Sequence, residues 1–141
     1  MQNELQAIVT KIDILIRNLK EKREWQKYDE LEFELYLYAA RVYEYEAVYN
    51  DKKIALDVDE TKEYQKISWA VQKLSEAAKT KLVEVALVDK YREKDNYKAN
   101  VDKYKNYLYA FSRIADHMKS GFIKDMADAK RQNMVTGDFN W

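Results

Sequence analysis

Side chains that could carry out enzyme chemistry are few in this sequence. There is no cysteine and only one histidine, His117, so a metal site would have to consist mostly of carboxylates. Asp57 and Asp59 have the spacing of a DxD metal-binding pair, but a helix N-terminal cap explains the two acids more simply. There is no glycine-rich phosphate loop, and no base lies near any of the four serines, Ser68, Ser75, Ser112 and Ser120. We therefore expect no enzyme, no metal and no cofactor, with His117 on a helix surface or at an interface.

Phosphate binding is the other chemistry that these residue types allow. Lys62, Lys66 and Lys73 are expected in neighbouring turns on the outside of one helix, with Lys79 and Lys81 further along. Such lysines form either an ordinary solvated face or a set of phosphate contacts. The twelve tyrosines also have two interpretations, because a tyrosine ring can be buried at an interface or can stack on a base.

The composition predicts an all-α protein built as a bundle of three to five helices with long amphipathic helices. The 141 residues include no proline and only two glycines, too few turn formers for a sheet protein, and they suit a single helical domain. The formal net charge is zero, yet residues 31–60 carry a net −5 and residues 61–141 a net +5. This asymmetry suits pairing of the two regions within one chain or between subunits.

The first helix is expected over about residues 3–23, within an N-terminal heptad segment at 1–27. Its apolar positions keep heptad spacing, which is typical of a coiled-coil seam between subunits but also of an amphipathic helix packed on its own domain. These positions are Leu5, Ile8, Ile12, Leu15 and Leu19.

The second helix, expected at about 29–56, carries two apolar stripes. Tyr38 and Tyr45 belong to one stripe, and Tyr43 belongs to the other. Because a helix that is apolar on two sides must be covered on two sides, we expect a homo-oligomer, with these tyrosines at its interface.

The remaining helices are expected at about 60–92 and 96–121, followed by a short one. A boundary is predicted at 56–61, where Asp57 or Asp59 would cap the third helix, whereas the polar stretch 89–100 could be loop or helix. Gly121 is expected to end the fourth helix. Residues 135–141 are expected to be a tail whose Phe139 and Trp141 dock on the bundle or on a neighbour.

The apolar residues do not form a membrane span. No run approaches the roughly 18 residues that a span requires, and the start MQNELQAIVT lacks the basic flank of a secretory signal. We expect a soluble protein in the cytoplasm, which is the host cytoplasm if the gene belongs to a phage.

The segment from Asp89 to Met126 has the pattern of a known family. An acidic-basic pair precedes a long aromatic-aliphatic helix, then a basic residue, Gly-Phe and Ile-Lys, and a string Lys-Lys-Ile-Ala-Leu lies upstream at 52–56. Over about residues 30–137 the chain resembles the UvsY-type recombination mediators of tailed phages. It differs from them at Asp57 and Asp59, where family members tend to be basic. The residues that carry the resemblance are Asp89, Lys90, Lys119, Gly121, Phe122, Ile123, Lys124 and Gly137.

The resemblance implies a ring-like homo-oligomer of helical subunits that binds single-stranded DNA. Such a ring helps to load a recombinase past a single-strand-binding protein, without enzyme chemistry. Lys52, Lys53, Lys62 and Lys66 of each subunit would make weak phosphate contacts that add up by avidity, together with Lys73.

Two other functions suit the same sequence. A small, neutral, aromatic-rich helical protein without catalytic residues could instead be a phage protein that binds and inhibits a host defence protein. It could also be a purely structural helical oligomer.

Overall fold

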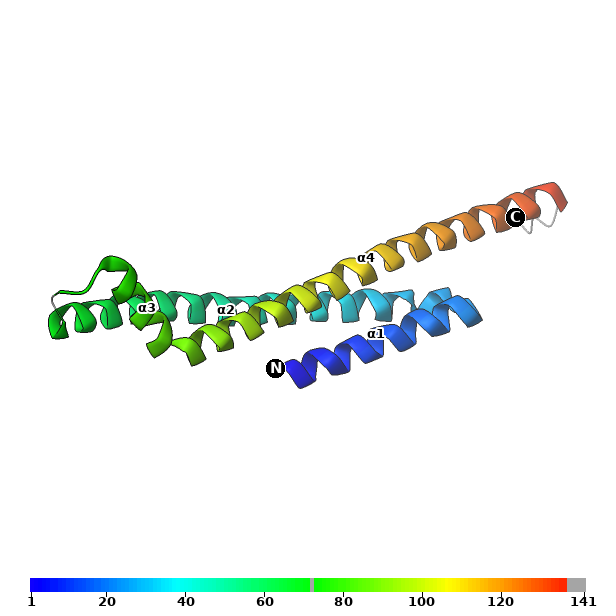
Figure 1. Cartoon of the computed structure of the whole chain (residues 1–141). Helices are drawn as coiled ribbons and strands as arrows, with labels where there is room; N and C mark the ends of the chain where they lie inside the picture. Colours follow the sequence, from blue (N-terminus) through cyan, green and yellow to red (C-terminus); the bar gives the residue numbers. More distant parts are fainter. Residues whose placement is uncertain (72, 137–141) are drawn as a thin grey trace. The chain divides into compact units, whose positions relative to one another are not determined.

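The computed structural model describes residues 1–71 and 73–136, and every regular element within them is helical. The order is α1 (Gln2–Lys22), a single 3₁₀ turn η1 (Trp25–Lys27), α2 (Tyr28–Ala70), α3 (Glu76–Ala86) and α4 (Val88–Thr136) (Figure 1). The predicted all-α class is therefore confirmed. No helix in this described part is both long and apolar enough to cross a membrane.

The chain forms two compact units. The first consists of residues 1–41 together with those from 105 onward, and the second consists of Val42–Tyr104. Both α2 and α4 contribute to both units, whereas α1 belongs to the first unit and α3 to the second.

The first unit is a three-helix arrangement of α1, the start of α2 and the later part of α4. Two ion pairs fix α1 antiparallel to α2, at 2.6 Å from Lys11 to Glu34 and at 2.9 Å from Arg41 to Glu4. The hydroxyl of Tyr28 donates a hydrogen bond of 2.9 Å to a carbonyl oxygen of α4. The core between these helices is apolar: Leu5, Ile8, Ile12, Leu19, Leu31, Tyr38, Phe111, Ala115 and Met118 are all buried.

The heptad positions of α1 therefore serve the chain's own core. Leu5, Ile8, Ile12 and Leu19 are buried in the single chain, and Leu15 is half-buried. Of the two interpretations of the heptad pattern, the structure has the helix packed on its own domain, which leaves these four side chains little surface for a second subunit.

The turn between α1 and α2 is built without glycine. Arg23 has a left-handed backbone (φ 50°), and its N–H donates to the carbonyl oxygen of Leu19, which ends α1. Arg23 also lies 3.5 Å from Asp125 of α4, and Trp25 packs against Phe122, with ring centroids 5.7 Å apart. Contacts to α4 thus hold the segment that follows α1.

The predicted boundary at 56–61 is wrong, because α2 continues without interruption through it to Ala70 (Figure 1). Nothing in that segment breaks a helix, and the buried Leu56 holds it against the rest of the second unit. The expected cap at Asp57 or Asp59 is therefore absent. The predicted helix at 60–92 is also wrong: α2 ends at Ala70, and Ser75 caps α3, its hydroxyl accepting a hydrogen bond of 3.2 Å from the N–H of Ala78.

The second unit packs α3 and the first part of α4 against α2. Leu56, Val83 and Leu87 form its buried centre, with Tyr64, Ile67 and Tyr91 packed around them. Nearer the start of the unit, Tyr45 stacks on Tyr97, with ring centroids 5.2 Å apart, and meets Tyr104 edge-on at 5.9 Å. Aromatic rings therefore fill much of the interface between α2 and α4 in this unit.

One helix, α4, covers all of 88–136. The polar stretch 89–100 is helical, and the helix passes through Gly121, so the predicted stop at this glycine is wrong. A glycine ends a helix when it adopts a left-handed conformation, and Gly121 remains helical. Of the predicted tail 135–141, residues 135 and 136 are helical, whereas Phe139 and Trp141 lie outside the described residues.

Gly121→Ala should stabilise the protein. A Cβ at this position would meet nothing within 4 Å, so the methyl group fits, and an alanine loses less backbone entropy in a helix than a glycine does. We expect the free energy of unfolding to rise by about 0.5–1 kcal/mol, measured by urea denaturation followed by circular dichroism. An unchanged or lowered midpoint would contradict a helical Gly121.

Candidate nucleic-acid interface

The five predicted phosphate-binding lysines all lie in the second unit, but they differ in their surroundings. Lys52 is committed to a partner: its Nζ lies 2.6 Å from Glu93 Oε1 and 4.8 Å above the centre of the Tyr97 ring. The hydrogen bond to Glu93 raises the pKa of Lys52. Lys52 thus helps to join α2 to α4 and is poorly placed to contact phosphate.

The other lysines are exposed on different sides of the chain. Lys53 and Lys62 are nine residues apart, which is about two and a half helical turns, so they point to opposite sides of α2. Lys62 and Lys66 are four residues apart and share one side. Lys73 lies beyond the end of α2, in the link to α3. Of the four exposed lysines, the structure therefore brings only Lys62 and Lys66 onto one helix face.

Trp69 lies on this same face of α2, and sequence reasoning did not single it out. It follows Lys66 by three residues and Lys62 by seven, the spacing that aligns side chains on a helix. Its side chain is 83% exposed. We call Lys62, Lys66 and Trp69 the α2 tip face. The spacing that aligns Trp69 with the two lysines can be read from the sequence. The predicted helix at 60–92, however, placed residue 69 well inside a helix and not at its end.

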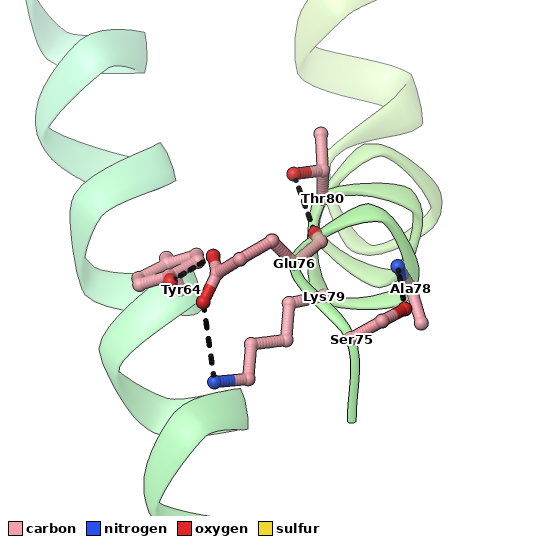
Figure 2. A network of polar contacts seen from close by, with 6 residues as sticks. All are labelled: Tyr64, Ser75, Glu76, Ala78, Lys79 and Thr80. Carbon is pink, nitrogen blue, oxygen red and sulfur yellow. Dashed lines mark hydrogen bonds and ion pairs between the residues drawn. The ribbon is translucent and has the colours of Figure 1, made fainter. Parts of the chain in front are cut away.

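Three carboxylates near the α2 tip face have partners within the unit. Asp59 accepts a hydrogen bond of 2.5 Å from Lys90, and Glu60 accepts one of 2.7 Å from the hydroxyl of Tyr91. Glu76 accepts a hydrogen bond from Tyr64 and lies 3.7 Å from the Lys79 ammonium, as Figure 2 shows. These contacts draw the acids toward α3 and α4 and leave the lysines outside. Asp59, one of the two acids by which the chain departs from the mediators, is thereby neutralised by Lys90.

A cavity of about 480 Å³ lies on the inner side of the same unit, between α2, α3 and the start of α4. Its lining includes Glu60, Glu84, Tyr64 and Tyr91 and contains no lysine or arginine. An anionic strand would be repelled there, so the outside of α2 is the better surface for a phosphate backbone.

No group of three metal-binding side chains comes together in the part of the chain that the structure describes. His117 is exposed on α4, as expected. Ser75 caps α3, so its hydroxyl has a structural role. The described residues thus offer no cluster with which to argue metal chemistry.

The tyrosines that were predicted at a subunit interface fall into two classes. Tyr38 and Tyr45 are buried within the chain, where they pack against aromatic rings of α4. Tyr43 is 59% exposed. Phe33 and Tyr36 of α2 are also exposed, at 65% and 76%. The first apolar stripe of α2 therefore belongs to the chain's own core, and the second stripe remains uncovered in the single chain.

The hydroxyl of Tyr91 should make stability fall at alkaline pH. Burial, with help from the hydrogen bond to Glu60, raises the pKa of Tyr91 from 10.0 to about 12. The folded state thus favours the neutral phenol, so this contribution is complete below pH 10 and is lost as the pH rises from 10 to 12. The free energy of unfolding should fall more steeply over this window in the wild type than in Tyr91→Phe, measured by urea denaturation at each pH. Equal slopes would contradict a partly buried phenol that donates to Glu60.

No family model, no curated protein and no solved structure matches this chain. The resemblance to the UvsY-type mediators therefore stays a prediction from the sequence. A function has to be argued from the exposed side chains of α2 and from the acids that pair behind them.

Proposed function

We propose that this protein is a non-enzymatic recombination mediator, of the phage type, that binds single-stranded DNA and a recombinase as a homo-oligomer. The observation that carries the proposal is the α2 tip face. There Lys62 and Lys66 are exposed, and neither forms an ion pair with an acid in the part of the chain that is described. Three neighbouring acids, Asp59, Glu60 and Glu76, pair with Lys90, Tyr91 and Tyr64. Glu63, which follows Lys62 directly, is half-buried and has no such partner among the described residues.

Two lysines alone give weak affinity, so the proposal requires several copies. Each phosphate contact releases condensed counterions, and contacts from linked subunits add by avidity. A binder assembled in this way holds a strand tightly at low salt and releases it readily as salt rises. That behaviour suits a protein that must hand the strand to a recombinase.

The uncovered stripe of α2 supplies surface for protein contacts. Large exposed apolar side chains on a helix face favour association, and Phe33, Tyr36 and Tyr43 are of this kind. These residues suit a second copy of the chain or a recombinase. They equally support a second candidate function, the binding and inhibition of a host protein by a small helical phage protein.

Replacing both tip lysines should weaken DNA binding and its dependence on salt. For single strands the slope of log affinity against log salt is about −0.7 for each phosphate neutralised, so Lys62→Gln with Lys66→Gln should reduce its magnitude by about 1.4 per subunit engaged. The measurement is fluorescence anisotropy of a labelled oligothymidine at a series of salt concentrations.

Lys52→Gln is the matched control, because it removes the same charge from a lysine that already pairs with Glu93. It should leave the slope unchanged. Absence of wild-type binding at tens of micromolar protein in low salt would reject the mediator and favour the inhibitor.

A further inference from the structure

Trp69 is the most exposed large hydrophobic side chain in the described part of the chain, at 83%. It lies in the last turn of α2, which ends at Ala70. The core of this unit passes along the opposite side of the helix, through Leu56 and Ile67. An indole held in water on a well-formed helix is costly unless something covers it, because tryptophan carries the largest apolar surface of any side chain.

The neighbours of Trp69 indicate what would cover it. On its own face the indole is preceded by Lys66 and, one turn earlier, by Lys62. Two ammonium groups beside an aromatic plane match a strand of nucleic acid, in which phosphates alternate with flat bases. The inner side of α2 carries Glu60, which accepts a hydrogen bond from Tyr91, and borders the acidic cavity. Charge on this unit therefore directs an anionic ligand to the outer side, where the indole lies.

Helix geometry gives the two lysines and the indole a suitable reach. Lys62 and Trp69 are seven residues apart, so their Cα atoms are separated by about 10 Å along the axis. Lys66 lies between them on nearly the same line. A strand that runs along α2 can thus place phosphates over the lysines and one base over the ring.

We infer that Trp69 stacks on an unpaired base of single-stranded DNA while Lys62 and Lys66 contact the phosphates beside it. The inference rests on the proposed function and adds to it the part of the ligand that is recognised. In a duplex the faces of the bases are covered by their neighbours, so the indole can stack only where a base is free. Trp69 would therefore make the protein prefer single strands over duplex of equal charge.

An abasic oligonucleotide tests this stacking directly, because it keeps the phosphates and lacks the bases. Wild type should bind a labelled oligothymidine at least about fivefold more tightly than an abasic strand of equal length. Trp69→Ala should lose this difference, with an unchanged affinity for the abasic strand and an unchanged salt slope. Trp69→Phe should retain part of it, since a phenyl ring also stacks.

The tip lysines provide the contrasting variant. Lys62→Gln with Lys66→Gln should weaken binding to both strands alike and keep the preference for the strand with bases. Because Trp69 is exposed, its variants should have the circular dichroism spectrum and urea midpoint of the wild type.

Three results would overturn the inference, and they are distinct. Equal oligothymidine binding by wild type and Trp69→Ala, with weaker binding by the lysine variant, rejects the stacking and leaves the proposed function intact. No binding of either strand by wild type rejects both. Loss of binding to phosphatidylserine vesicles in Trp69→Ala, with DNA binding unchanged, would assign the indole to a lipid surface instead.

Discussion

Burial of one apolar stripe along α2 is the interaction on which both units depend. In the first unit Leu31 and Tyr38 of this stripe meet α1 and α4, and in the second Tyr45 and Leu56 meet α4 and α3. No proline or glycine lies within α2, so no residue type that breaks helices interrupts it. The stripe therefore runs through both units, and the other helices pack against it.

Charge is organised around the same helix. Part of the acidic excess of residues 31–60 is met by basic groups from elsewhere in the same unit, from Lys11 opposite Glu34 and from Lys90 opposite Asp59. Exposed ion pairs of this kind contribute little stability each, but they decide which charges are left over. Among the charges left over near the end of α2 are those of Lys62 and Lys66, although the chain as a whole is neutral.

Periodicity predicted the helical class, the bounds of α1 and the stripe of α2, because a spacing of three and four residues follows directly from helix geometry. The errors concern where helices end. Asp57-Val58-Asp59 and Gly121 resemble helix ends, yet burial of Leu56 and of Met118 beside them favours continuous helix. The end at Ala70 has no glycine or proline to announce it, so Trp69 was not recognised as a residue of a helix terminus. Which lysines pair with acids depends on contacts between helices, and these contacts cannot be read from a single sequence.

The turn at Arg23 is supported by contacts that lie far apart in the sequence. A left-handed backbone costs an arginine about 1–2 kcal/mol that a glycine would not lose, so the isolated segment has little tendency to reverse direction there. Part of the compensation comes from α4, through Asp125 and the packing of Phe122 on Trp25. Phe122 and Asp125 lie 97 and 102 positions after Trp25 and Arg23, so these contacts close a long loop. The reversal between α1 and α2 is thus supported both by the direct contacts of these two helices and by contacts that close a long loop.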